Sequence, residues 1–117
     1  MQILVIDDSE LTHEIIHDWL LETYSIKAIL ALSVKDGIKR IHEFNFDLIV
    51  CDFEMPDGNG SEVLKYLREL KSTIPFILFT GRFDIEMPIQ KPIIEVISDK
   101  SYETLFKVIQ KQIDHRV

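Results

Sequence analysis

Short runs of apolar residues recur along the chain at intervals typical of buried β-strands. Five runs of four or five residues are continuous rather than alternating, and they are rich in Ile and Val: 3–6, 26–30, 48–51, 76–79 and 93–97. Continuous runs indicate strands that are covered on both faces, as in a parallel sheet. The pattern therefore predicts five parallel strands.

Between these runs, apolar residues recur with helical spacing. The stripes are Ile15, Ile16, Trp19 and Leu20; Ile38 and Ile41; Val63, Leu64, Leu67 and Leu70; and Leu105, Ile109 and Ile113. Ser33, Ser61 and Ser101 lie where helix N-caps are expected. The alternation of strands and helices predicts an α/β fold, a doubly wound five-stranded parallel sheet with helices on both faces. In segment 82–92, Pro88 and Pro92 predict a short or irregular fourth helix.

Length and composition favour one domain in a reducing compartment. The 117 residues predict a single domain over 1–117. Cys51 is the only cysteine, so no internal disulfide can form. The longest uncharged stretch, 72–81, is about half of the ~20 residues that a membrane span needs. Asp7 and Asp8 lie where a signal peptide would be basic and then apolar. We therefore expect a cytoplasmic protein without a membrane partner.

The formal net charge of −7 argues against direct nucleic-acid binding. Residues 1–60 hold 12 acidic and 4 basic residues, whereas residues 61–117 hold 8 and 9. The acidic excess thus lies in the first half of the chain, and it raises the question of where those carboxylates meet.

Polar residues follow the predicted strands at the points where a doubly wound sheet binds its ligands, the carboxyl ends of the strands. Asp7 and Asp8 follow the first strand, Asp52 the third, Thr80 the fourth and Lys100 the fifth. We expect these side chains to meet at one edge of the sheet.

Three carboxylates at one edge imply a cation. Two carboxylates about 4 Å apart repel by roughly 4 kcal/mol at an effective dielectric of 20. Hard oxygen ligands favour Mg²⁺, which uses only one or two carboxylates and keeps several waters. One carboxylate would then be free as a nucleophile toward phosphorus. Lys100 would neutralise a transferring phosphoryl group, and Thr80 would donate a hydrogen bond to it.

With these residues in order, the whole chain resembles the receiver domains of two-component response regulators. The matching pieces are Asp7-Asp8-Ser9, segment 52–60 (DFEMPDGNG), Thr80-Gly81 and Lys100. Asp52 lies 44 residues after Asp8, and a Gly follows eight residues past Asp52, both typical of the family.

The resemblance implies a flavodoxin-like strand order of 2-1-3-4-5 and a role for each site residue. Asp52 resembles the phosphoacceptor, and Asp7, Asp8, Asp52 and the backbone carbonyl of Glu54 resemble the Mg²⁺ ligands. Thr80 resembles the switch hydroxyl and Lys100 its salt-bridge partner. Glu54 and Arg82 match the variable positions associated with acyl-phosphate lifetime.

The function implied is a phosphorylatable switch of a two-component phosphorelay. It is a phosphoacceptor that promotes its own phosphorylation and dephosphorylation rather than an enzyme acting on other substrates. The phosphoryl donor would be a sensor histidine kinase or a phosphotransfer protein, and a downstream effector protein would read the change. Many receivers also form homodimers. The alternative is a phosphorylation-independent interaction module of the same fold.

Several positions depart from the family pattern. Receivers usually have a proline after the lysine, but Ser101 follows Lys100, whereas Lys91 precedes Pro92. Lys91 lies too soon after Thr80 to allow a crossover and a strand between them, which favours Lys100. Ile97 occupies the position of the family's switch aromatic residue, and Phe83 or Tyr102 are the candidate substitutes.

The segment His13-Glu14-Ile15-Ile16-His17 matches the HExxH motif of zinc proteases. Because the stripe of Ile15, Ile16, Trp19 and Leu20 is expected to face the core, both histidines are predicted to face solvent. No third ligand is placed nearby, so we interpret them as surface residues rather than as a zinc site.

Overall fold

The computed structural model describes residues 1–85, 87 and 89–115. Its central sheet has five parallel strands in the order β2-β1-β3-β6-β7: β1 (Ile3–Ile6), β2 (Ile29–Ala31), β3 (Leu48–Cys51), β6 (Phe76–Phe79) and β7 (Ile93–Ile97). Counting only these strands, the order is 2-1-3-4-5, as the family resemblance implied. A small hairpin, β4 (Glu54–Met55) and β5 (Gly58–Asn59), follows β3.

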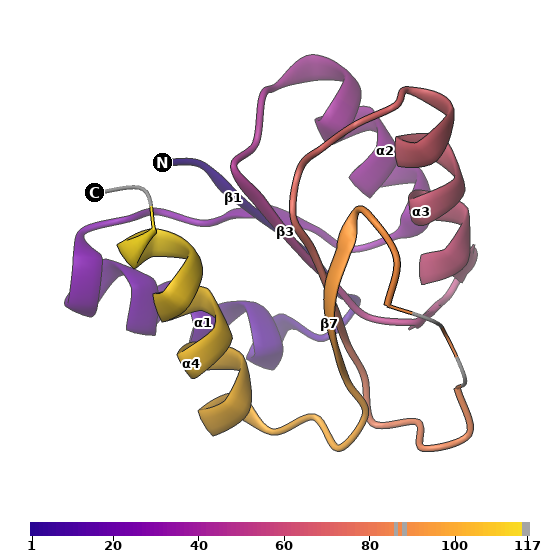
Figure 1. Cartoon of the computed structure of the whole chain (residues 1–117). Helices are drawn as coiled ribbons and strands as arrows, with labels where there is room; N and C mark the ends of the chain where they lie inside the picture. The colour runs from indigo at the N-terminus through magenta and orange to yellow at the C-terminus, as the bar shows by residue number, and fades with distance from the viewer. Residues whose placement is uncertain (86, 88, 116–117) are drawn as a thin grey trace.

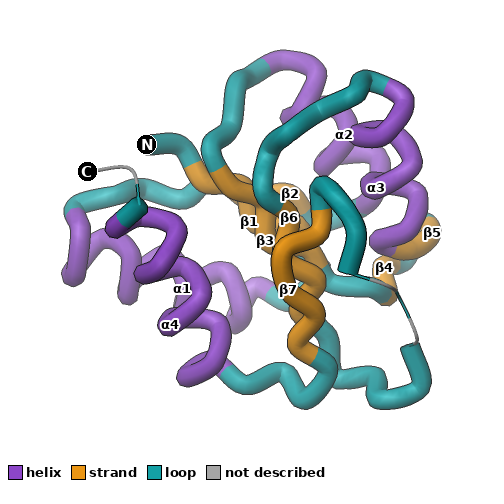
Figure 2. The backbone as a smooth tube through the Cα atoms, in the orientation of Figure 1, coloured by secondary structure: helices purple, strands orange, loops and turns teal. Residues whose placement is uncertain are grey.

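Four helices of the described residues cover the two faces of the sheet. They are α1 (Glu10–Tyr24), α2 (Val34–Glu43), α3 (Gly60–Glu69) and α4 (Tyr102–Asp114). Figure 1 shows α1 and α4 on one side of the sheet and α2 and α3 on the other, and the tube in Figure 2 shows the strands stacked between them. No helix in the described part of the chain is long and apolar enough to cross a bilayer.

The continuous apolar runs have a direct explanation in the two cores. On β1, Leu4 and Ile6 pack toward α2 and α3, whereas Ile3 and Val5 pack toward α1 and α4. All four of these side chains have no exposed surface. Since both of their faces are covered, every position of β1, β3 and β6 is apolar. The edge strand β7 is only partly buried and includes Glu95. The predicted bounds of β1, β3, β6 and β7 are confirmed.

The second strand begins at Ile29, so the prediction of a strand over 26–30 was wrong at both ends. Ser25 ends α1 in the left-handed conformation with φ 58°, and the N–H of Ile26 donates to the Leu20 carbonyl. The Ser25 N–H also donates to the Leu21 carbonyl at 3.0 Å, and this 5→1 bond from a left-handed residue is the αL C-cap motif. Ile26 therefore belongs to the end of α1, and its side chain adds to the core beneath it.

Two of the three predicted N-cap residues are confirmed. Ser33 and Ser101 cap α2 and α4 through their hydroxyls, which accept from backbone N–H groups. Asn59, rather than Ser61, caps α3, because the hairpin β4–β5 brings the chain into the helix two residues earlier. Leu70 follows α3 and is 55% exposed, so its assignment to the apolar stripe was wrong.

The α1 stripe is rotated from its predicted position. Its buried residues are Thr12, His13, Ile16 and Leu20, whereas Ile15 and Trp19 are only half-buried. The rotation turns His13 toward the sheet, and the prediction that His13 faces solvent was wrong. The prediction placed the buried face of α1 from its large apolar residues alone. That face is displaced in the structure because the helix also buries Thr12 and His13.

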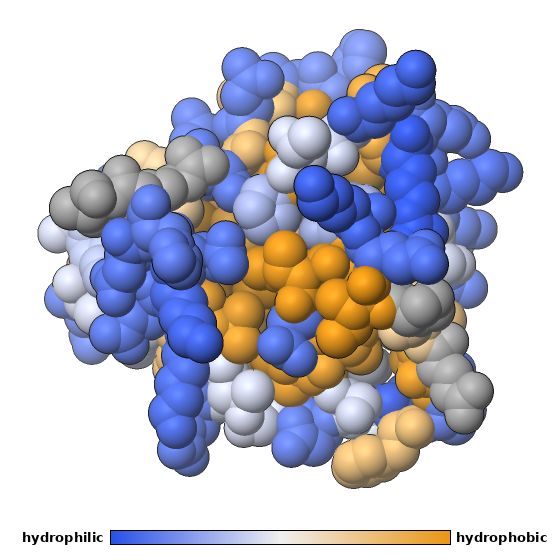
Figure 3. Space-filling model, viewed as in Figure 1, coloured by the Kyte–Doolittle hydropathy of each residue, from blue (hydrophilic) through white to orange (hydrophobic). Residues whose placement is uncertain are grey.

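Between β6 and β7 the described residues form no helix. The described segment is thus irregular, as expected, although no short helix forms in it. Pro88, one reason for that prediction, lies outside the described residues. The peptide bond between Lys91 and Pro92 is cis. In the space-filling view, apolar side chains gather over β7, between α4 and the side of the molecule formed by α2 and α3 (Figure 3).

Candidate functional site

The carboxyl ends of the strands bring the predicted acids together. Carboxylate oxygens of Asp7, Asp8 and Asp52 all lie within 4.8 Å of one another. Among the described residues, this is the only group of three or more His, Cys, Asp or Glu side chains close enough to share a metal ion. Asp7 is buried, Asp52 is half-buried and Asp8 is exposed, so the cluster opens to solvent on one side.

Lys100 joins the two less exposed acids of this cluster. Its Nζ donates to Asp7 Oδ2 at 2.8 Å and to Asp52 Oδ2 at 3.2 Å. Its backbone N–H donates to the Thr80 carbonyl, which places it beside the end of β6. Lys91 precedes β7 and therefore lies at the opposite end of this strand from the acids. The geometry thus agrees with the choice of Lys100 over Lys91.

Backbone donors hold two of the carboxylates in place. The N–H of Ser9 donates to Asp7 Oδ1 at 2.8 Å, just before α1 begins. The N–H of Phe53 donates to Asp52 Oδ1 at 2.7 Å. Since each carboxylate is oriented by a backbone N–H one or two residues further along the chain, the local sequence after β1 and β3 positions the site.

Burial and charge shift the pKa values of the central pair. Burial, and secondly the charge of Asp7, raise the pKa of the Asp52 carboxyl above its ordinary value, although Lys100 opposes this change. For Lys100, burial acts to lower the pKa, but its hydrogen bond to Asp7 and the charges of both acids outweigh burial and raise it. Lys100 therefore stays protonated, whereas the Asp52 carboxyl takes up a proton at a higher pH than an ordinary aspartate carboxyl does.

Thr80 directly follows β6 and has 1% of its surface exposed. Its Oγ1 accepts from the Arg82 backbone N–H at 3.3 Å, which leaves the hydroxyl hydrogen able to donate elsewhere. The Arg82 guanidinium pairs with the carboxylates of Glu54 and Asp84 and lies 5.7 Å from the centre of the Phe53 ring. These exposed groups form a charged rim beside the acids, and Arg82 lowers the pKa of Asp84.

The turn after Asp52 needs glycine at two positions. A Cβ on Gly60 would lie 2.8 Å from the Asp52 carbonyl oxygen, and Gly58 has φ +157°. Between them and Asp52, Asp57 accepts from the backbone N–H groups of Val34 and Lys35, both at 2.9 Å. These hydrogen bonds lower the pKa of Asp57 and tie the hairpin to the start of α2. Sequence reasoning missed this cap, because Asp57 before a Gly is also typical of a plain turn.

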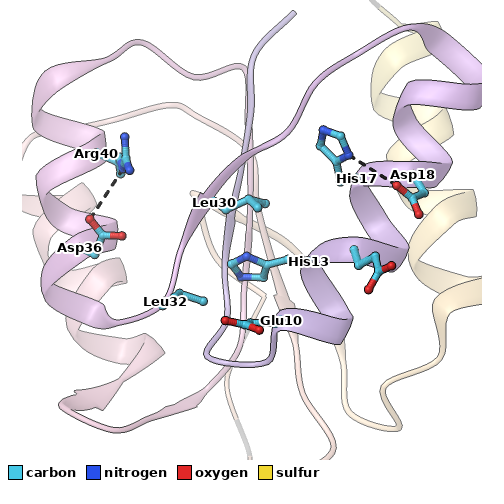
Figure 4. A pocket seen from close by; sticks show the side chains of 9 residues that line it. Glu10, His13, His17, Asp18, Leu30, Leu32, Asp36 and Arg40 are labelled. Atoms are coloured by element: carbon cyan, nitrogen blue, oxygen red, sulfur yellow. Dashed lines mark ion pairs between the residues drawn. The ribbon is translucent and has the colours of Figure 1, made fainter.

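The HExxH histidines do not form a metal site with a third described ligand. His13 is 3% exposed, and its Nε2 has no hydrogen-bond partner among the described residues. Burial lowers its pKa, while hydrogen bonding to the backbone of Asp7 acts in the opposite direction. His17 lies further along α1, where its Nδ1 is 3.7 Å from Asp18 (Figure 4). The zinc interpretation therefore gains no support.

Comparisons with known proteins agree with this geometry. The chain matches the response regulator receiver domain family over residues 3–114. A protein-glutamate methylesterase/protein-glutamine glutaminase of Trichodesmium erythraeum is 36% identical over 81 residues, covering 68% of this chain and 23% of that protein. The transcriptional regulatory protein ZraR of Salmonella typhimurium is 27% identical over 119 residues, covering 98% of this chain and 27% of that protein. The chain thus spans about a quarter of these relatives.

Solved structures show the same fold. The response regulator TrrA of Thermotoga maritima, solved in complex with Mg²⁺-BeF, has a TM-score of 0.83 and 26% identity, covering 95% of this chain and 97% of that one. The receiver domain of NtrC4, solved as a beryllofluoride-activated dimer, has a TM-score of 0.79 and 23% identity, covering 99% and 98%. The match over residues 3–114, the shared fold and the acids at the strand ends lead to one conclusion: the chain belongs to the family of response regulator receiver domains.

Proposed function

We propose that this receiver domain, spanning residues 1–117, accepts a phosphoryl group on Asp52 and acts as a two-component signalling switch. The observation that carries the proposal is the position of Lys100, whose Nζ lies within hydrogen-bond distance of both Asp7 and Asp52. An ammonium held beside a half-buried carboxylate is suited to neutralise the charge of a phosphoryl group transferred to that carboxylate.

The transfer itself needs few parts. A carboxylate oxygen of Asp52 attacks phosphorus, a P–O bond forms, and the P–N bond to the donor's histidine breaks. The electron pair of that bond stays on the imidazole nitrogen. Asp52 must be ionised to attack, and Lys100 supports the ionised form by opposing the effect of burial on the Asp52 pKa. The same chain would promote hydrolysis of the acyl phosphate, which resets the switch.

The acidic cluster fits Mg²⁺. Three carboxylates and one ammonium leave two negative charges in excess, which a divalent cation would balance. Asp7, Asp8 and Asp52, with the backbone carbonyl of Glu54, are the residues that would hold it, and their hard oxygen atoms suit this ion. When bound, Mg²⁺ supplies charge stabilisation to phosphoryl oxygens. The Mg²⁺-BeF complex of the Thermotoga maritima relative supports this proposal.

Thr80 would respond to the new group. Its hydroxyl oxygen accepts a hydrogen bond of 3.3 Å from Arg82 N–H, and the hydroxyl hydrogen can turn to donate to a phosphoryl oxygen near Asp52. The added charge of about −1.5 to −2 would bias the domain between two packed states. Receiver domains interact with phosphohistidine proteins and with effectors, and we propose that a histidine kinase or phosphotransfer protein loads this one. A downstream protein would read the phosphorylated state. A cytoplasmic location and a homodimer remain predictions.

Acetyl phosphate tests the proposal without a partner protein. The purified chain is incubated with Mg²⁺ and acetyl phosphate, and its intact mass is measured. We expect the mass of one phosphoryl group to be added to the wild type and to Lys91→Met, the control at an exposed lysine, but not to Asp52→Asn. No adduct on the wild type, or an equal adduct on Asp52→Asn, would contradict the proposal and favour the phosphorylation-independent interaction module.

A further inference from the structure

Tyr102, in the first turn of α4, contacts residues next to the acidic site. The centre of its ring lies 5.2 Å from that of Phe79, the residue before Thr80. Its hydroxyl lies 3.1 Å from Thr12 Oγ1, in the first turn of α1. Only Ser101 separates it from Lys100 in the chain. One side chain therefore contacts the last residue of β6 and the first turn of α1, and it lies two residues after Lys100 in the chain.

Lys100 is linked to the same ring contact. Its Nζ lies 5.3 Å from the centre of the Phe79 ring, within the range of a cation–π interaction. Its backbone has φ 52°, and the next residue, Ser101, caps α4 by accepting from Thr104 N–H. A shift of the ammonium toward a phosphoryl group would therefore act on Phe79 and on the start of α4.

The aromatic contacts continue away from the site between α1 and α4. The Tyr102 and Phe106 ring centres lie 6.1 Å apart. Phe106 stacks on Trp19 with centres 4.1 Å apart and an interplanar angle of 6°, and Trp19 meets Tyr24 edge-on at 5.6 Å. All four residues are half-buried. A chain of ring contacts thus runs from the site to a partly exposed face.

The residues near β7 are less suited to couple the acidic site to a distant surface. Ile97, at the position where the resemblance expects an aromatic switch residue, is buried and aliphatic. Phe83, the other candidate substitute, is 78% exposed and therefore poorly placed to sense the site. The described residues between Arg82 and Pro92 form no helix that could move as a unit.

We propose, building on the function proposed above, that Tyr102 is a positioning residue that couples the state of the Asp52 site to the packing of Trp19 between α1 and α4. The signal of this domain then emerges on the α1–α4 face. Phosphorylation redirects Lys100, the contacts of Tyr102 with Phe79 and Thr12 readjust, and the stack of Phe106 on Trp19 changes. Phosphorylation of Asp52 and the packing of Trp19 can be measured separately.

Trp19 is the only tryptophan in the chain, so its fluorescence reports this face directly. The full chain is treated with Mg²⁺ and acetyl phosphate, and intact mass and Trp19 emission are followed in the same sample. Tyr102→Phe removes only the hydroxyl, and Thr12→Val removes its partner at similar volume. Tyr66→Phe, on α3 against the opposite core, is the matched control. Circular dichroism confirms that each variant is folded.

We expect the wild type and Tyr66→Phe to gain the phosphoryl mass and to change their Trp19 emission in proportion. Tyr102→Phe and Thr12→Val should gain the same mass with an emission change reduced about twofold or more. An adduct without any emission change, or unreduced changes in both variants, would overturn the coupling role alone. No adduct on the wild type would overturn the proposed function and this inference with it.

Discussion

Replacing Lys100 with Met tests the electrostatics of the site most sharply. The substitution keeps a long, apolar side chain but removes the ammonium that lies 2.8 Å from Asp7 Oδ2 and 3.2 Å from Asp52 Oδ2. Lys100 opposes the effects of burial and of Asp7 on the Asp52 pKa. Its loss should therefore raise the pKa of Asp52 further.

The size of the shift follows from the distance. A unit charge 3.2 Å from another contributes about 5 kcal/mol at an effective dielectric of 20. The Lys100 side chain is 24% exposed, so solvent screens part of this interaction. If only a third remains, the Asp52 pKa still rises by about one unit, since one unit corresponds to about 1.4 kcal/mol.

Carbon-13 NMR of the Asp52 carboxyl in metal-free protein measures this pKa directly. The titration midpoint should lie about one unit higher in Lys100→Met than in the wild type. Lys91→Met removes an exposed lysine at the far end of β7 and should leave the midpoint unchanged. A midpoint in Lys100→Met that is unchanged or lower would refute the reasoning, and a shift in Lys91→Met alone would point to the other lysine.

Three further predictions concern stability. Asp57→Ala should lower the urea midpoint, because Val34 and Lys35 N–H groups at the start of α2 lose their acceptor; an unchanged midpoint would show that the cap is dispensable. Burial lowers the pKa of His13 in the folded state, so folding favours the neutral imidazole. The contribution of His13 to the free energy of unfolding is therefore complete above pH 6.5 and falls as the pH falls below 6.5. Urea unfolding at several pH values should show a flatter profile for His13→Gln, and a profile as steep as that of the wild type would exclude this role. Mg²⁺ at a hundred times its Kd should stabilise the wild type by about 2.7 kcal/mol, and much less at the same concentration in Asp8→Asn; equal stabilisation would remove Asp8 from the ligands.

The sheet and the acids at its edge could be predicted because they follow from local pattern and one topological rule. A strand covered on both faces has no polar position, so its end is marked by the first polar residue, as at Asp7 and Asp52. Parallel strands then bring those ends to the same edge. The choice of Lys100 over Lys91 followed from spacing, since the ten residues between Thr80 and Lys91 leave too little room for a crossover and a strand.

Other features depend on contacts that no local pattern contains. The burial of His13 depends on the rotation of α1 about its own axis where the helix packs on the sheet. A stripe of apolar residues determines that rotation only approximately. The cap that Asp57 gives α2 joins residues more than 20 positions apart. The bond between Thr12 and Tyr102 spans 90 positions. Such contacts depend on how the helices dock, so they became visible only in three dimensions.

The central claim is that Asp52 receives a phosphoryl group with the help of Mg²⁺. Peptide mapping of the chain after treatment with acetyl phosphate, with Mg²⁺ or with EDTA, tests it most directly. The account predicts one acyl phosphate, located on Asp52 and lost when EDTA replaces Mg²⁺. A phosphoryl group on another residue, or equal labelling of Asp52 in EDTA, would contradict it.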